Sequence, residues 1–510
     1  MRQPSVVLAF LVTAIIFWSL APHPGKGVLT LLSINHARVL YTSSALAVAS
    51  AKLFGVLFGL LGFYLLRGRT ALDMRSGVGA VIGSTGISNG ALLLSRWLGG
   101  AGLLMLLALA LMINAMVFQG LRGDGTIQPL VYLQTYCAFL LPVIFFAASC
   151  AVLFDSVGAL MGKAGDLIYL VLWTAQFPML DHFIAGGSKA FAPWMFFDIS
   201  GAGMSLIMLS MKLGLPVSAI SKGVSMYEPQ LAAVSLPDAL WPAAMFSTRL
   251  VSAGLAMLLL LPAIALFHRF SADVVKAGST RRWSSPWAML NRWSRPLSRL
   301  IRPWPQLAAA LPGILGLAIA DVALTLIAAP VALAALIILF VTATAVDIDR
   351  LPMLTVVAIA FWGILVSDVS VRDFQADTEL MVLALPGGSL QRYWRQMIAA
   401  SLLGLLLVLP ISLRWAFQEP LRAAALLSGI LSLSAMASLL GRCSHNARFF
   451  LVVFMLWLYV ANNEPFAPML DIVGFNGVAN GASIFMQLGC AMFAALAGFA
   501  YHRLGRLSAR

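Results

Sequence analysis

Charged residues are scarce in this sequence. Only 10% of its 510 residues are Asp, Glu, Lys or Arg, while 61% are hydrophobic. A soluble domain is about a quarter charged and roughly half apolar. Because long apolar runs cross a bilayer as helices, this composition excludes an ordinary water-soluble protein. It predicts an all-α polytopic membrane protein.

A phosphate-binding loop and the HExxH zinc motif are also missing. The nearest string to a phosphate-binding loop, Gly158 to Ala164, is one residue short between its glycines and lacks the Ser or Thr that binds magnesium. No HExxH motif occurs. The cysteines have no spacing that suggests zinc or a disulfide framework; they are Cys137, Cys150, Cys443 and Cys490. We therefore expect no enzyme site, no metal and no cofactor in this chain.

Long apolar segments recur along the whole chain. A spanning helix needs about 20 mostly apolar residues, and about twelve segments qualify. They are residues 5–21, 43–66, 98–118, 131–153, 166–180, 250–268, 328–346, 352–369, 397–413, 421–440, 447–461 and 482–501. We expect the first to be retained as a span rather than cleaved as a signal peptide. Residues 309–325 contain Pro312, Gly313 and Asp321, which favours an interfacial helix over another span.

The basic residues are distributed unevenly between the two sides that these spans define. With twelve spans and both termini in the cytoplasm, most of the 33 Lys and Arg residues fall in cytoplasmic segments. The positive-inside rule predicts this asymmetry for a cell (inner or cytoplasmic) membrane protein. The net charge of +14 is thereby explained by topology, and we expect no nucleic-acid partner.

A small polar island occurs twice, each time before an apolar run. The islands are GSTGISNGALLLSRWLGGA at 83–101 and LALPGGSLQRYWRQMIA at 383–399. When residues 87–90 are placed over residues 386–389, Arg96 falls on Arg395. Each island follows a long span and a short charged stretch. This order predicts two parallel six-helix repeats, related by a pseudo-two-fold axis along the membrane normal.

The repeat divides the chain into three parts. Residues 1–268 form the first six-span half, 269–308 a basic cytoplasmic linker, and 309–510 the second half. The linker alternates Trp and Leu with Arg, a pattern typical of a segment lying on an anionic leaflet. Residues 181–249 form the largest outside segment and are expected to pack on the membrane surface as short helices or to re-enter it.

Lys52 is the clearest charged residue inside a predicted span. Ionisable residues within a membrane often mark a pathway. Lys52 either lines a cavity or extends its amine toward the outer interface. The sequence leaves both interpretations open.

With these islands the chain resembles the membrane subunit of type-2 ABC exporters. Members of that family carry, between the second and third spans of each half, a charged lead-in, a short helix, a Pro/Gly/Ser knuckle and a basic start to the next span. Here the second half has Asp373 and Glu379, then LMVLALPGGS, then Arg392 and Arg395. The first half has Asp73, Arg75, GAVIGSTGISNG and Arg96, and lacks the proline and the counterpart of Glu379.

The resemblance implies that each island is a coupling helix docked on a separate ABC ATPase, with two ATPase copies per chain. ATP is then bound only by those ATPase partners. Membrane lipids and accessory proteins are the other expected partners. The candidate docking residues are Ser88, Asn89, Glu379, Gly387, Gly388 and Ser389. The implied function is a permease of an ATP-driven exporter that moves an unidentified, amphipathic substrate.

Two other classes of function remain open from the sequence. A membrane-embedded lipid- or glycan-modifying enzyme would need acids and bases gathered at one face, and the only candidates are in 181–249: Asp181, His182, Asp198 and Glu228. A secondary transporter would often show a ladder of Asp, Glu and His across the membrane. No such ladder is visible in the sequence.

Overall fold

The computed structural model describes most of the chain. The described residues are Trp18, 29–161, 165–166, 168–176, 193–214, 225–238, 241–267, Ile301, 303–328, 330–375, Thr378, Met381, 388–444, 447–463 and 465–508. The chain divides into two compact units, unit 1 (Met1–Arg281) and unit 2 (Arg282–Arg510). This boundary falls inside the segment predicted as the linker, most of which lies outside the described residues.

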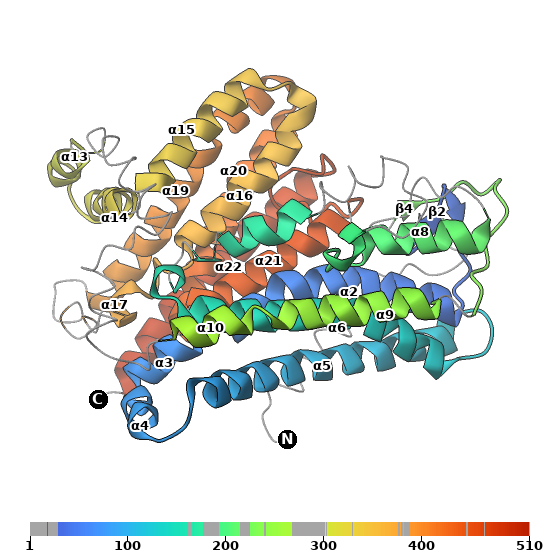
Figure 1. The fold of residues 1–510 in the computed structure, drawn as a ribbon. Helices are drawn as coiled ribbons and strands as arrows, with labels where there is room; N and C mark the ends of the chain where they lie inside the picture. Colours follow the sequence, from blue (N-terminus) through green and yellow to red (C-terminus); the bar gives the residue numbers. More distant parts are fainter. Residues whose placement is uncertain are drawn as a thin grey trace. The chain divides into compact units, whose positions relative to one another are not determined.

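Both units are built mainly from helices (Figure 1). Unit 1 contains α2 (Ser43–Leu66), α3 (Arg69–Arg75), α4 (Val78–Ser84), α5 (Asn89–Arg122), α6 (Pro129–Ser156), α8 (Ala202–Leu213), α9 (Ala243–Met257) and α10 (Leu260–Leu266). Unit 2 contains α13 (Trp304–Ala310), α14 (Ile314–Ala328), α15 (Pro330–Ala345), α16 (Leu351–Val366), α17 (Arg372–Gln375), α19 (Gly388–Gln418), α20 (Pro420–Ser444), α21 (Ala447–Asn463) and α22 (Gly481–Ser508).

Eight helices of the described part are long and apolar enough to cross a membrane. Each overlaps one of the predicted spans, so the chain is a mainly helical, multi-pass, membrane-embedded protein. The eight are Ser43–Met74, Asn89–Arg122, Pro129–Ser156, Ala243–Leu266, Ile348–Val366, Gln391–Gln418, Pro420–Ser444 and Gly481–Tyr501. Two further predicted spans correspond to shorter helices, α15 and α21. The remaining two, 5–21 and 166–180, lie largely or partly outside the described residues.

Local sequence signals explain where several helices begin and bend. The Thr42 side chain caps α2, and the Ser88 hydroxyl accepts a hydrogen bond from the Ala91 amide at 3.2 Å to cap α5. Gly68, with φ +90°, separates α2 from α3. The break between α9 and α10 lies at Leu258 and Leu259. Pro262, four residues after Leu258, accounts for it because a proline ring clashes with the carbonyl of residue i−4.

Short strands close one end of unit 1. The strand β1 (Leu29–Thr30) pairs with β4 (Ser225–Met226), and β2 (Ser33–Ile34) pairs with β3 (Ala37–Arg38), both antiparallel. Val39 also bridges to Val234. The stretch before α2 is thus tied to the segment predicted as the large outside loop, which also contains α8.

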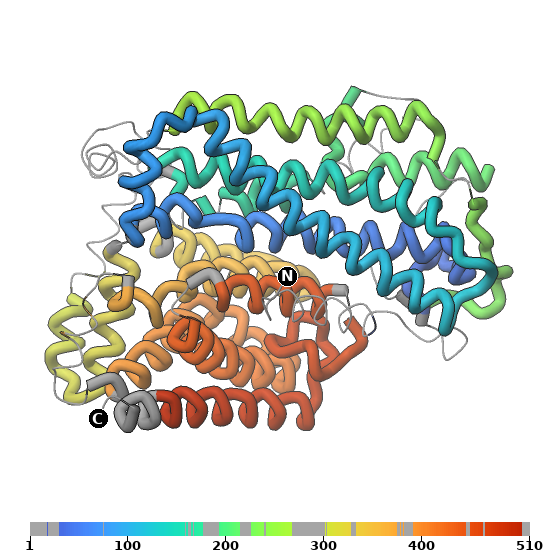
Figure 2. The backbone as a smooth tube through the Cα atoms, turned by 90° about the horizontal axis from the view of Figure 1, so that it is seen from below, coloured from blue at the N-terminus to red at the C-terminus, as the bar shows by residue number. Residues whose placement is uncertain are grey.

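The long helices pack against one another within each unit. In unit 1, α6 packs against α2, α5 and α9, and these helices run side by side (Figure 2). In unit 2, α19 packs against α14, α15, α16, α20 and α22, while α20 packs against α19, α21 and α22. Glycines allow close approach in both bundles. Gly62 faces Leu104 and Ala147, and Gly404 faces Trp362 and Ile430.

A buried carboxylate organises the loop between α21 and α22. Asp471 is fully buried, and it accepts hydrogen bonds from the amides of Asn476 at 3.1 Å and Val478 at 3.2 Å. Burial raises the pKa of Asp471, and those two amide donors oppose the rise. Arg422 at the start of α20 donates to the carbonyls of Gly474 at 2.6 Å and Phe475 at 3.0 Å. The loop is therefore fixed to α20 through its backbone.

The contact between Gly59 and Trp173 gives a stability prediction. A Cβ at Gly59 would overlap the indole ring of Trp173, which is 1% exposed, whereas a Cβ at Gly55, one turn earlier on α2, would meet only a Leu140 methyl at 3.5 Å. Gly59→Ala is expected to lower stability by about 1–3 kcal/mol through overpacking. Gly55→Ala is the matched control and is expected to leave stability unchanged or higher. Thermal unfolding in detergent distinguishes them; equal midpoints would contradict the close packing of α2 against Trp173.

Candidate functional site

A buried ion-pair cluster lies at the end of α2. Arg67 is 4% exposed and forms an ion pair with Asp166, and its Nε lies 3.8 Å from Asp155 Oδ1 on α6. The amide of Gly68 donates to Asp155 Oδ2 at 2.6 Å. The rings of Phe63 and Phe154 lie 5.1 and 5.8 Å from the guanidinium carbon. The cluster joins the ends of α2 and α6 to the helical segment that includes Asp166.

A second ion pair connects α3 to the start of α5. Arg96 lies 2.5 Å from Asp73 Oδ2 and donates to the hydroxyl of Thr70 at 2.7 Å. Asp73 and Thr70 are both on α3, so a single side chain on α5 holds that short helix from two positions. We name this set, Arg96 with Asp73 and Thr70, the first clamp.

Unit 2 contains a comparable arrangement at the start of α19. Arg392 Nε lies 2.6 Å from Asp373 Oδ2 on α17, and Arg395 Nε lies 2.8 Å from Asp321 Oδ2 on α14. Gln396 donates to Asp373 at 3.4 Å. We name this set the second clamp. In both units an Asp between two long helices is bound by basic or amide side chains from the first turns of the next long helix.

The short helix α4 leads into the first island and contains its first two residues, Gly83 and Ser84. It forms the end of this part of unit 1, next to α3 (Figure 1). Val78 and Val81 on α4 are 47% and 65% exposed, and Ile82 is half-buried. Gly77, with φ +73° and open space around its Cα, forms the turn before α4. An exposed apolar ridge on a helix of seven residues is a surface that a partner can cover.

The predicted docking residues have different positions in the structure. Ser88 caps α5, and the Asn89 side chain donates to the Phe267 carbonyl at the end of α10 at 3.1 Å. Gly388 and Ser389 are the first residues of α19. Glu379 and Gly387 lie outside the described residues. The docking roles of all these residues therefore stay predictions, while Ser88 and Asn89 also have structural roles.

Lys52 lies on α2 and is partly buried. It lines neither the cavity beside the first clamp nor the hollow around Glu419 and Arg422. Its role in a cavity stays a prediction.

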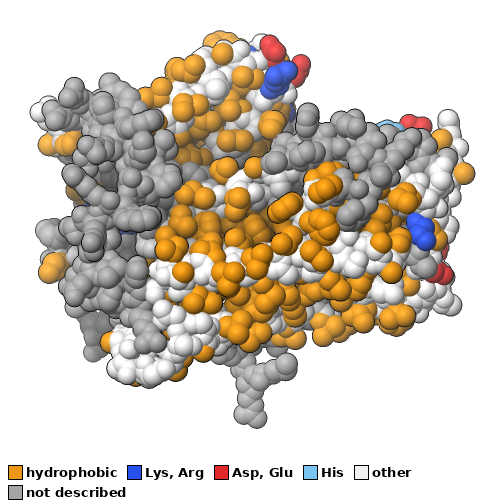
Figure 3. All heavy atoms as spheres, in the orientation of Figure 1, with side chains coloured by type: hydrophobic (Ala, Val, Ile, Leu, Met, Phe, Trp, Pro, Cys, Tyr) orange, Lys and Arg blue, Asp and Glu red, His pale blue; other side chains and the backbone are white. Residues whose placement is uncertain are grey.

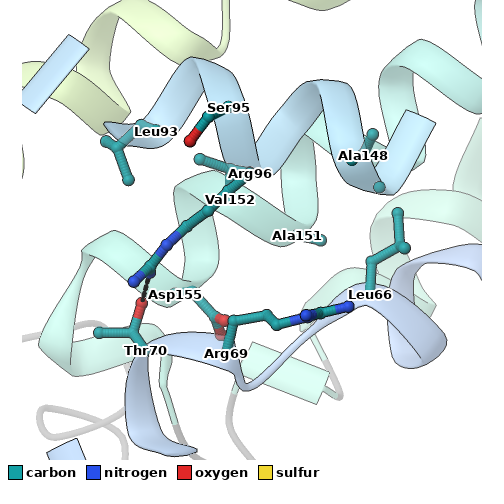
Figure 4. Close-up of a pocket in the computed structure, with 12 residues that line it drawn as sticks. Leu66, Arg69, Thr70, Leu93, Ser95, Arg96, Ala148, Ala151, Val152 and Asp155 are labelled. Carbon is teal, nitrogen blue, oxygen red and sulfur yellow. Dashed lines mark hydrogen bonds between the residues drawn. The ribbon is translucent and has the colours of Figure 1, made fainter. Parts of the chain in front are cut away.

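A cavity of about 280 Å³ opens beside the first clamp, between α3, α5 and α6. Figure 4 shows Thr70, Asp155 and Arg69 along one side and α5 with Leu93 and Ser95 along the other, with Arg96 reaching across to Thr70. The apolar part of the wall comes from Leu66, Leu93, Gly99, Gly100, Ala148, Ala151 and Val152. Within the described ranges, no three His, Cys, Asp or Glu side chains lie close enough to hold a metal ion.

Sequence reasoning did not identify the ion pairs that shape this region. The sequence shows the basic residues of these pairs only as part of the cytoplasmic excess of Lys and Arg, and it indicates no partner for any of them. The scarcity of acidic residues could have indicated these ion pairs. An Asp at the end of an apolar segment needs a cationic partner if it is buried. The partners lie up to 99 residues apart in the chain, so the sequence could not pair them.

Comparison of this chain with protein families, with curated proteins and with solved structures finds no match. Its function therefore has to be inferred from its own residues and their arrangement.

Proposed function

We propose that this protein is the permease of an ATP-driven ABC exporter, energised by a separate ATPase. In this proposal twelve spans form two parallel six-helix repeats in the cell membrane, with both termini in the cytoplasm. One observation carries the proposal most. The segment between two long helices is held by an Asp clamp in both units, through Asp73 in unit 1 and Asp373 in unit 2.

Other packing details support a repeat. The order α2, α5, α6 in unit 1 corresponds to α16, α19, α20 in unit 2. On α2, Gly59 lies against the ring of Trp173; on α16, Gly363 lies against the ring of Phe454 in the same manner. Trp173 lies in the helical segment that follows α6, and Phe454 lies in α21, which follows α20. Matching glycine–aromatic contacts of this kind favour a duplicated half.

The clamp suggests how force would pass from a partner to the membrane helices. A push on α4 reaches α3 directly, because the two are separated only by Ser76 and Gly77. Arg96 transfers it to α5 through Asp73, and Arg67 links the adjacent end of α2 to Asp155 on α6. Buried ion pairs with good geometry resist separation, since breaking one leaves an uncompensated charge. The island would therefore move as one body with three spanning helices.

The energy source is assigned to the partner because the sequence has no phosphate-binding loop. The substrate of the proposal is an amphipathic molecule, in keeping with the apolar composition of the spans. The purified chain is expected neither to bind nor to hydrolyse ATP, and hydrolysis should appear when an ABC ATPase is co-expressed and co-purified. Stoichiometric ATP hydrolysis by the chain alone would contradict the proposal.

The proposed orientation gives a labelling prediction. Residue 279 should lie in the cytoplasm and residue 225 outside. In a background with the four native cysteines replaced by alanine, an impermeant maleimide added to intact cells should label Ser225→Cys, and should label Ser279→Cys only after lysis. Labelling of Ser279→Cys in intact cells, with Ser225→Cys protected, would reverse the orientation.

A further inference from the structure

Two guanidinium groups and one carboxylate line the cavity beside the first clamp, and they belong to Arg69, Arg96 and Asp155. Asp155 lies near Arg67 and accepts the Gly68 amide, and Arg96 is paired with Asp73. Arg69 is exposed and, among the residues that the structure describes, has no carboxylate partner. Arg69 also lies close enough to Arg96 for the two cations to repel each other. An anion placed between them would be attracted by both.

A neutral donor is available beside the two guanidinium groups. Thr70 accepts a hydrogen bond from Arg96, which leaves its own hydroxyl proton to donate. Ser95, on the opposite side, already donates its hydroxyl proton to the Leu92 carbonyl at 2.8 Å. Two guanidinium groups with the Thr70 hydroxyl form a donor set suited to phosphate oxygens.

The other wall is apolar and continues onto a lipid-facing surface. Leu66, Leu93, Ala148, Ala151 and Val152 are buried along it. From this end of α5, an exposed apolar stripe runs with helical spacing along the helix: Leu94, Leu98, Met105, Leu109, Ile113, Val117 and Leu121. Figure 3 shows hydrophobic side chains covering much of this face of unit 1. A ligand with an anionic head and a long apolar tail would match both parts.

The length of α5 places the cavity near a membrane surface. Its 34 residues extend about 51 Å at 1.5 Å per residue, whereas the hydrocarbon core is about 30 Å thick. The cavity is lined by residues from the first turns of α5. This end of the helix can therefore reach the level of lipid headgroups.

We propose that this cavity binds the phosphate of an anionic membrane phospholipid, with Arg69 and Arg96 facing the phosphate and the acyl chains lying along α5. Lipid binding here would be independent of the proposed transport activity. The glycines on α5 give a matched pair for testing it. Gly99 lines the cavity and Gly102 does not, and a Cβ at either position meets open space.

The test is a titration of the purified protein, in uncharged detergent, with phosphatidylglycerol or phosphatidylcholine, counting bound lipids by native mass spectrometry. The wild type should bind phosphatidylglycerol at least about fivefold more tightly than phosphatidylcholine, as expected when an anionic headgroup meets a cluster of basic residues. Gly99→Leu should lose this preference by filling the cavity without changing any charge. Gly102→Leu should keep it. Arg69→Gln should lose it and Arg69→Lys should retain most of it.

A parallel titration with inorganic phosphate distinguishes the two sources of the anion. Millimolar phosphate should not displace phosphatidylglycerol, because free phosphate lacks the apolar contacts along α5. Displacement by phosphate would overturn the lipid assignment, and so would equal binding of phosphatidylglycerol and phosphatidylcholine by the wild type. Unchanged binding in Gly99→Leu would overturn the position of the site even if Arg69→Gln failed to fold.

Discussion

Arg67→Gln is expected to destabilise unit 1 strongly, because it removes a buried cation that two carboxylates share. Arg67 is 4% exposed, and its loss leaves Asp155 and Asp166 without this common partner. Breaking a buried ion pair by removing one partner costs roughly 3–5 kcal/mol. The measurement is thermal unfolding of the purified protein in detergent, followed by tryptophan fluorescence.

Arg69, two residues after Arg67, provides the matched control. Arg69→Gln makes the same chemical change two residues later at an exposed position, where substitutions usually change stability by less than about 0.5 kcal/mol. Adding Asp166→Asn to Arg67→Gln should recover part of the lost stability, because it removes one of the two carboxylates that lost their cation. Equal unfolding midpoints for Arg67→Gln and Arg69→Gln would contradict the proposed role of the cluster.

Val81→Asp is expected to prevent capture of the proposed ATPase partner while leaving this chain folded. Val81 is 65% exposed on α4, so a carboxylate there is solvated in the free chain and costs little stability. In a complex the same carboxylate would be buried without a partner, and such desolvation is strongly unfavourable. We expect the amount of co-purified ATPase to fall by at least about tenfold, which corresponds to about 1.4 kcal/mol of binding free energy.

A control at the far end of unit 1 separates docking from general effects of charge. Ala232→Asp adds the same charge at an exposed position in the segment that pairs with the strands before α2. Its ATPase capture should equal that of the wild type. Normal capture by Val81→Asp, at normal expression, would remove α4, the helix that leads into the first island, from the docking surface.

The structure changes which variants best test the islands. Ser88→Trp would place bulk at the predicted contact, but it would also remove the cap of α5, which typically stabilises a helix by about 1 kcal/mol. Val81 is a cleaner probe, because its side chain has no such capping role. In unit 2, Gly388→Trp is the corresponding variant, at the first residue of α19, and the double variant with Val81→Asp should lose capture entirely.

Helix positions were largely predictable from the sequence, whereas the clamps were not. Apolar length alone identifies α5 and α6, since a spanning helix requires little more than about 20 apolar residues. The β1–β4 pairing joins Leu29 to Met226, and no local pattern in two-residue strands indicates such a partner. The Arg67 cluster joins residues 99 positions apart, so the sequence presents its charges only one by one, as features of a membrane boundary.

The alignment of the two islands pairs two arginines that have similar contacts in the structure, but it misses a third. Aligning the islands places Arg96 over Arg395. In the structure each of these arginines lies near the start of a long helix and forms an ion pair, Arg96 with Asp73 and Arg395 with Asp321. However, Arg392 rather than Arg395 is the close partner of Asp373. Which of the two arginines contacts Asp373 depends on the direction in which each side chain leaves the helix. A sequence alignment contains no information about that direction.

The central claim is that both islands dock on an ABC ATPase, and photo-crosslinking in cells tests it most directly. A photoreactive amino acid is placed at Val81, at Ser389 or, as a lipid-facing control, at Leu98, which is 56% exposed on α5. The adducts are then identified by mass spectrometry. We predict that positions 81 and 389 each crosslink to the same protein with ABC ATPase motifs and that position 98 does not. The absence of an ATPase adduct from both position 81, on the helix that leads into the first island, and position 389, in the second island, with the variants normally expressed, would contradict the proposed function.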